Sequence, residues 1–312
     1  MCAEGGTCDW HSEVIFRAKN PMGPWEECPN NPILTQRTGL DPNREDIVTS
    51  TGHADLVQDA KGGWWAVFLG CRPYEDDFYN TGRDTYLLPV TWKDGWPEIL
   101  GKGKAVPTVL AKTEWQKKAK TEGAIPTSGN YTFSDDFKSG KLDSRWIFLR
   151  NPSNFYSFTD KGLAIEGKEV NISQRESPSA VFFRQCHGAF EAQTEFTFTP
   201  KADKQLAGLA IVQNENYNFV FGKTMHNGKY MVTLTRAEKD NAVVASAFLN
   251  EKEASMPLRL KVVGEGRYYS FYYATSGDWQ LLAKGVDAVN LSTHQSGGFI
   301  GACIGLYATN NK

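Results

Sequence analysis

The chain has 312 residues, which is enough for two domains that each bury a core. Its 34 basic and 36 acidic residues leave a formal net charge of −2, so neither a nucleic acid nor an anionic membrane is indicated as a partner. Aromatic residues make up 12% of the chain and glycine occurs 29 times, a profile typical of an all-β protein with many turns.

The cysteines and histidines show no metal-site pattern. No two of the six cysteines have the C-x-x-C spacing, so we expect free thiols. No apolar run reaches the length of a membrane-spanning helix. The opening residues, MCAEGGTCDW, lack the basic start and apolar stretch of a signal peptide. They are typical of the end of a strand before a Gly-Gly turn, so we expect Met1 to be internal to a longer protein. The sequence does not decide whether that protein is cytoplasmic, periplasmic or secreted.

Residues 1–110 alternate short strands with turns. Runs of β-branched and aromatic residues between Gly, Pro and Asn predict strands. Four of them form one meander of about 40–50 residues with a Trp-rich second strand, the size of one propeller blade. The region therefore holds about one and a half to two blades. The predicted strands cover residues 13–18, 25–28, 33–35, 54–58, 64–69, 85–92 and 97–100.

Residues 111–130 are rich in Lys, Gly, Pro and Ser, and they predict a linker with at most a helical turn. From residue 131 to 312 short strands recur at regular spacing, and two of them, 189–199 and 258–263, alternate cleanly between apolar and polar residues. This pattern predicts a two-sheet β-sandwich or jelly roll. The further strands are expected over residues 163–166, 180–184, 207–213, 218–223, 230–236, 242–249, 268–274, 279–282 and 299–307.

The polar and aromatic loop between the second and third blade strands holds the best binding candidate. Arg83 follows Gly82 at the mouth of a strand and offers a planar donor fork that can bind sugar hydroxyls or a carboxylate. The plainer interpretation is a salt bridge to Asp84 or Glu75. His53 lies where a strand enters the blade, so it can reach a central ion or water, although a surface histidine is the commoner case.

The usual catalytic motifs are absent. The chain has no G-x-S-x-G nucleophile motif, and the sequence GKGK at 101–104 is followed by no helix that could bind phosphate. Paired carboxylates would suit sugar chemistry, but the acidic residues stand out by composition alone. These are Glu4, Asp41, Glu45, Asp46, Glu75, Asp76 and Asp77.

Three long segments resemble one family. AEGGTCDWHSEVIFRAKNPMGPWEECPNNPILTQR, TGHADLVQDAKGGWWAVFLGCRPY and NTGRDTYLLPVTWKDGWPEI are similar to the last third of the catalytic domain of glycoside hydrolase family 43, in the group of β-xylosidases and α-L-arabinofuranosidases. The remainder, from SDDFKSGKLDSRWIFLRNP to GFIGACIGLYATNN, resembles the concanavalin-like sandwich appended to those enzymes.

The resemblance implies the last two or so blades of a five-bladed propeller followed by a concanavalin-like sandwich. It also implies inverting hydrolysis of terminal xylose or arabinose by an Asp base, a pKa-tuning Asp and a Glu acid. In the family all three precede the AEGGT-like segment, so we expect no catalytic residue in this chain, and Glu4 does not replace the acid. The chain by itself should then be inactive.

Four residues inherit expected binding roles from the resemblance. His53 matches a histidine at the propeller centre near a calcium ion or water, so we expect at most a structural Ca²⁺ reached through water. Arg83 matches an arginine that contacts substrate, although Asp84 stands where Glu is usual. Tyr217 or Phe219 is the nearest match to a sandwich aromatic that closes the pocket.

The expected partner is a xylo- or arabino-oligosaccharide, and self-association stays open. The alternative hypotheses are a non-catalytic carbohydrate-binding or structural module and a chain completed by a partner polypeptide.

Overall fold

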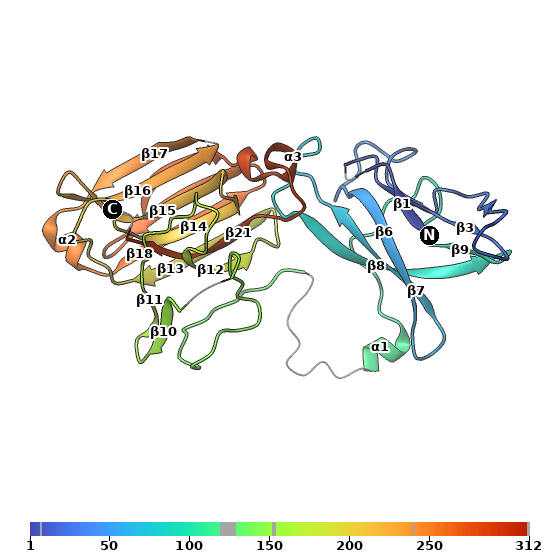
Figure 1. Ribbon diagram of the computed structural model, residues 1–312, viewed down its shortest axis with the longest axis horizontal. Helices are drawn as coiled ribbons and strands as arrows, with labels where there is room; N and C mark the ends of the chain where they lie inside the picture. The colour runs from blue at the N-terminus through green and yellow to red at the C-terminus, as the bar shows by residue number, and fades with distance from the viewer. Residues whose placement is uncertain (7, 119–128, 152–153, 239, 311–312) are drawn as a thin grey trace. The chain divides into compact units, whose positions relative to one another are not determined.

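The computed structural model describes residues 1–6, 8–118, 129–151, 154–238 and 240–310 (Figure 1). They form strands and a few short helices, which confirms the all-β prediction. No helix in the described part of the chain is long and apolar enough to cross a membrane. The chain divides into two compact units, the first made of Met1–Gly70 and Thr85–Asp136, the second of Cys71–Asp84 and Phe137–Lys312.

The first unit is built on one four-stranded sheet in the order β6-β7-β8-β9. Each strand overlaps one predicted from the sequence, and β6 begins several residues before the predicted start. The strands around it are shorter: β1, β2 and β5 form a second sheet, and β3 pairs with β4. The bounds are β1 Cys2–Glu4, β2 Ser12–Val14, β3 Phe16–Arg17, β4 Glu26–Glu27, β5 Leu34–Thr35, β6 Thr49–Gln58, β7 Trp64–Cys71, β8 Arg83–Lys93 and β9 Trp96–Glu98.

Only one face of the four-stranded sheet is covered by the first unit's core. Because side chains alternate along a strand, every second residue faces the core. Ala66 and Phe68 of β7 point into that core, at 0% and 2% exposure. Residues of the opposite parity, Val57, Val67 and Leu87, are 48%, 37% and 44% exposed. An exposed apolar sheet face fits the prediction that this is part of a larger set of blades.

The predicted linker contains one short helix. α1 (Glu114–Lys118) has five residues, and Lys117 pairs with Glu114 one turn earlier. Residues 119–128 of the predicted linker lie outside the described residues.

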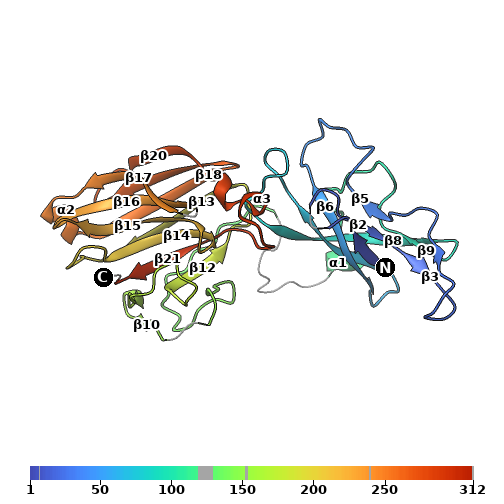
Figure 2. The same ribbon diagram turned by 45° about the horizontal axis from the view of Figure 1, so that its top comes forward.

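The second unit contains a two-sheet sandwich. A six-stranded sheet has the order β12-β21-β14-β15-β16-β17, and a four-stranded sheet has the order β13-β18-β19-β20. Figure 2 shows β21 between β12 and β14. The bounds are β12 Ser179–Arg184, β13 Ala189–Phe196, β14 Leu206–Asn214, β15 Tyr217–His226, β16 Lys229–Glu238, β17 Asp240–Phe248, β18 Leu258–Glu265, β19 Tyr268–Ala274, β20 Gln280–Asp287 and β21 Cys303–Thr309.

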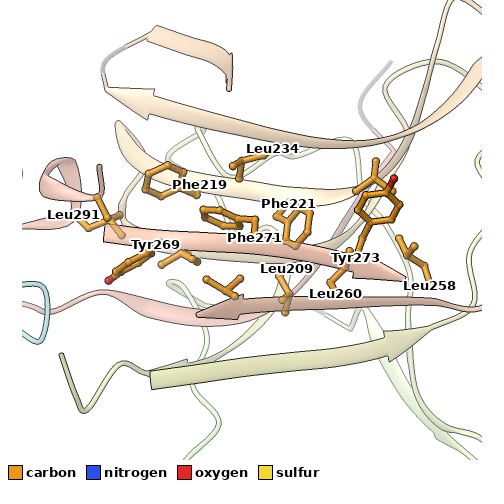
Figure 3. Close-up of a cluster of buried hydrophobic side chains, with 14 of the residues drawn as sticks. Leu209, Phe219, Phe221, Leu234, Leu258, Leu260, Tyr269, Phe271, Tyr273 and Leu291 are labelled. Carbon is orange, nitrogen blue, oxygen red and sulfur yellow. The ribbon is translucent and has the colours of Figure 1, made fainter. Parts of the chain in front are cut away.

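The two sheets enclose the main core (Figure 3). Leu258, Leu260 and Val262 of β18 are fully buried, as their alternation predicts, and Phe219 and Phe221 of β15 meet them from the other sheet. The inner strand β14 is apolar almost throughout because a second cluster covers its other face.

Several local features differ from the prediction. A hairpin of β10 (Tyr156–Thr159) and β11 (Gly162–Ile165) was predicted only in its second strand. Residues 299–302 were predicted as strand but precede β21 as loop, since Gly297 and Gly298 before this stretch and Gly301 within it favour turns. The second unit also contains three short helical elements: α2 (Glu251–Ser255), the 3₁₀ turn Val289–Leu291 and α3 (Thr293–Ser296). α2 begins with a capping box between Asn250 and Glu253.

Candidate functional site

The loop Cys71–Asp84 between β7 and β8 folds as part of the second unit. Its centre is Asn80, which is 3% exposed. The Asn80 side-chain amide donates to the Tyr269 hydroxyl at 3.1 Å and to the Ala288 carbonyl at 3.2 Å, and its backbone carbonyl accepts from Ala302 at 2.8 Å. The Tyr79 backbone N–H donates to the Ser292 hydroxyl at 3.1 Å. These bonds bind the loop to the sandwich.

Two glycines let the loop approach the sandwich backbone closely. A Cβ on Gly82 would lie 2.3 Å from the Gly301 nitrogen, and a Cβ on Gly301 would lie 2.2 Å from the Thr81 carbonyl oxygen. Gly82 also has a φ of 72°, a backbone conformation that residues other than glycine rarely adopt. The backbone next to Arg83 is therefore held against residues 300–301.

This approach places the Arg83 guanidinium 4.5 Å from the centre of the Phe299 ring. Phe299 is 60% exposed, so its ring remains open to solvent as well. A guanidinium over an aromatic face is a favourable cation–π arrangement. Together they present a donor fork beside an exposed apolar ring.

The salt bridges that the sequence suggested for Arg83 are made by other arginines. Asp84 accepts two hydrogen bonds from Arg72, at 2.7 and 3.1 Å, and Arg72 also donates to the Cys186 carbonyl at 2.8 Å. Glu75 pairs with Arg267 at 2.9 Å. Both carboxylates considered as partners of Arg83 are thus engaged elsewhere.

The two aromatic residues expected to close a pocket have different surroundings. Phe219 is 0% exposed and packs against Phe271 in the sandwich core. A ring with no accessible surface cannot offer its face to a sugar, so this expectation is corrected. Tyr217 is half-buried at the start of β15, after a turn that is bound to residues 296–300 through Gln213 and Asn214. Its binding role stays a prediction.

His53 belongs to the first unit, in β6, and is exposed. Its backbone has a φ of 54°, in the left-handed region. The carboxylate of Glu13, which is 1% exposed, accepts the backbone N–H of Ala54 at 2.9 Å, and the backbone N–H of His53 lies near it. Burial raises the pKa of Glu13, and these N–H groups together with the nearby His53 oppose that rise.

Comparison with known families identifies the two parts of the chain. Residues 134–312 match the beta xylosidase C-terminal Concanavalin A-like domain, and residues 1–97 match the glycosyl hydrolases family 43. The chain belongs to glycosyl hydrolase family 43. The second match ends within β9, the last strand of the meander that contains His53 and Arg83.

Named relatives of this family 43 chain extend over both units. It is 33% identical over 100% of its length to the non-reducing end alpha-L-arabinofuranosidase BoGH43B of Bacteroides ovatus, and 30% identical over 99% to a xylosidase/arabinosidase of Butyrivibrio fibrisolvens. The chain spans 56% and 58% of these two proteins. A crystal structure of a GH43_12 protein from a capybara gut metagenome is 36% identical with a TM-score of 0.82, over 98% of this chain and 57% of that one.

The residues of this family 43 chain do not fit a calcium ion held directly. Calcium takes six to eight oxygen ligands, whereas His53 offers an imidazole nitrogen. The Glu13 carboxylate is already bound to backbone N–H groups. In the described ranges, no three His, Cys, Asp or Glu side chains gather as a metal site would require. We assign no calcium ion to these side chains.

Three of the carboxylates singled out by composition make contacts within their own units. Glu4 pairs with Arg37 at 3.0 Å, Asp46 accepts from the Thr108 hydroxyl at 3.0 Å, and Asp77 lies 3.5 Å from His294. All six cysteines are free thiols in the structure.

Sequence reasoning missed Phe299. It was included in a predicted strand, although the surrounding GGFIG pattern is more typical of a loop. An aromatic residue between glycines in a loop was the signal available. The contact between Phe299 and Arg83 could not be predicted from the sequence, because the two residues are far apart in the chain.

Proposed function

We propose that this family 43 chain binds the terminal xylose or arabinose unit of an oligosaccharide, as part of a glycosidase that hydrolyses xylo- and arabino-oligosaccharides with inversion. Arg83 donates hydrogen bonds to the sugar hydroxyls, and Phe299 packs against the apolar face of the sugar. Tyr217 contributes a further polar contact within the second unit. In the first unit, the exposed imidazole of His53 offers a polar contact to a sugar.

The Arg83–Phe299 pair carries this proposal. A sugar needs planar hydrogen-bond donors and an apolar surface side by side, and these two residues lie 4.5 Å apart with Phe299 exposed. The carboxylates that could have neutralised Arg83 are bound by Arg72 and Arg267. The names of the relatives, an arabinofuranosidase and a xylosidase/arabinosidase, support the choice of a pentose.

We further propose that this chain holds neither the acid nor the base of the reaction. An inverting glycosidase needs two accessible carboxyl groups roughly 6.5–9.5 Å apart with a water between them. Burial raises the pKa of Glu13, as a general acid requires, but this side chain is 1% exposed and already accepts the Ala54 backbone N–H. It is therefore unsuited to proton transfer to a glycosidic oxygen.

Saturation-transfer NMR with xylose, arabinose and xylobiose tests sugar binding in the millimolar range. We expect Arg83→Met to weaken binding by about tenfold or more, because a hydrogen bond to a charged group contributes about 1.5–3 kcal/mol. Phe299→Ala should weaken binding several-fold. The matched control is Arg175→Met, since Arg175 is an exposed sandwich arginine that pairs with Glu215. Unchanged binding in Arg83→Met would refute the assignment.

An aryl-glycoside assay tests the catalytic part of the proposal. Residues 1–312 should release no nitrophenol from aryl xyloside or arabinofuranoside above the uncatalysed rate. Turnover that one carboxylate substitution abolishes would show that the chain contains its own acid or base. The alternative of a non-catalytic sugar-binding module predicts binding without turnover in any longer form of the protein.

A further inference from the structure

Glu13 is a buried carboxylate that the proposed function does not use. It lies on β2 and is 1% exposed. Burying an ionisable carboxyl group is costly unless its oxygens are hydrogen-bonded. Here the Ala54 N–H donates to Oε2 at 2.9 Å, and the backbone N–H of His53 lies near enough to the same carboxylate to oppose the rise in its pKa. Two consecutive backbone N–H groups are therefore directed towards one side chain of a neighbouring strand.

The residue between these donors has an unusual backbone. His53 has a φ of 54°, which L-residues other than glycine rarely adopt because Cβ approaches the following carbonyl oxygen. Such a conformation persists only where its surroundings impose it. The preceding Gly52 lies against the His11 ring, where an added Cβ would be 2.6 Å from His11 Cδ2. Residues 11–13 thus contact the backbone both before and after His53, at Gly52 and at Ala54.

We propose that Glu13 is a positioning residue, which holds His53 in the left-handed conformation and thereby sets the direction of its imidazole. The inference rests on the proposed role of His53 in sugar binding. A strand residue in the ordinary extended conformation would direct its side chain differently, since φ determines where Cβ points. A carboxylate suits this task because its two oxygens can accept both N–H groups at once.

Selective labelling makes the conformation of His53 measurable. The chain has five histidines, so ¹⁵N- and ¹³C-labelled histidine gives few backbone signals, and His53→Asn assigns the one of interest. A positive φ brings the amide proton close to Hα, which gives a strong intraresidue NOE and a characteristic three-bond coupling. The measurement reads the backbone whether or not the chain binds a sugar. Its failure is therefore distinguishable from failure of the proposed function.

Three variants separate positioning from simple packing. Glu13→Met keeps the volume but removes both acceptors, and we expect loss of the strong NOE at His53 and faster amide exchange at His53 and Ala54. Glu13→Gln keeps an acceptor oxygen and should largely restore the wild-type signals. Glu26→Gln is the control, because Glu26 is an exposed carboxylate paired with Arg17 in the same unit, and its removal should leave His53 unchanged.

A folded Glu13→Met protein in which His53 retains its positive-φ signature would overturn the proposal. So would Glu13→Gln if it loses that signature as fully as Glu13→Met does. If Glu13→Met does not fold, amide exchange in the wild-type protein decides. Slow exchange at His53 and Ala54 supports a bond to the buried carboxylate, and exchange as fast as in an exposed loop contradicts it.

Discussion

Removing the Asn80 side chain tests how strongly the loop Cys71–Asp84 is built into the second unit. Asn80→Ala deletes two donated hydrogen bonds and leaves the Ala288 carbonyl without that donor. The Tyr269 hydroxyl still donates to Gln185 at 2.7 Å, so it loses only one of its two hydrogen bonds. Each lost bond contributes about 1 kcal/mol, and a buried group left unsatisfied costs about 1–3 kcal/mol. The expected destabilisation is therefore about 3 kcal/mol.

Differential scanning calorimetry measures the effect. For a domain of about 150–250 residues, 1 kcal/mol shifts Tm by about 2–4 °C, so Asn80→Ala should lower the Tm of the second unit by about 6–12 °C. Asn241→Ala is the control, because Asn241 is exposed and its side-chain hydrogen bond to the Ser173 hydroxyl is long at 3.5 Å. A drop below 2 °C, or equal drops in the two variants, would refute the reasoning.

Two further predictions concern the second unit. Burial lowers the pKa of Lys223 to about 8, well below the value of about 10.4 in the unfolded chain. Between these two pH values the unfolded state binds more protons than the folded state. The free energy of unfolding should therefore rise as the pH is raised from about 8 to 10. Urea unfolding should show this rise, up to about 3 kcal/mol, in the wild type and not in Lys223→Met. An equal dependence of the free energy of unfolding on pH in the two proteins would contradict the prediction. Gly301→Ala should cost about 2 kcal/mol or more and weaken sugar binding, because its Cβ would lie 2.2 Å from the Thr81 carbonyl. Gly188→Ala, with nothing within 4 Å of its added Cβ, should be close to neutral in the same calorimetry, and equal losses would argue against the close approach.

Lys223 shows why burial of a charged residue escapes sequence reasoning. It lies in a strand that reads as ordinary alternation, yet it is 0% exposed and donates to the Ala254 and Met256 carbonyls at 2.9 and 3.1 Å. Those carbonyls are at the C-terminal end of α2, where a cation is favoured. The helix itself is short, and only the tertiary fold brings it to the lysine.

Strand periodicity is the part of the fold that local sequence determined. The alternation of β13 and β18 predicts their buried faces, and Leu258, Leu260 and Val262 are buried as expected. The Trp-rich meander likewise predicts β6 to β9. These predictions succeed because the period of side-chain direction in a strand is a local property of the backbone.

The site depends on contacts that no local pattern contains. Arg83 was identified by its position after Gly82 and by resemblance, but its neighbours were assigned incorrectly. Asp84 binds Arg72, and the aromatic ring beside Arg83 is Phe299, which was not among the predicted site residues. Both Phe219 and Phe299 are phenylalanines near glycine or asparagine turns, and only the packing of the two sheets makes one of them core and leaves the other exposed.

The sequence by itself determined the all-β class, the order of a blade region and a sandwich, the family and the residue types suited to a sugar. Tertiary structure decided that the loop Cys71–Asp84, which lies within the blade region of the sequence, folds with the sandwich. The hydrogen bonds that decide this join Tyr79 to Ser292 and Asn80 to Tyr269 and Ala288, across 213, 189 and 208 positions of the chain. Buried polar groups must find partners wherever the fold supplies them, and that requirement is not expressed in any sequence window.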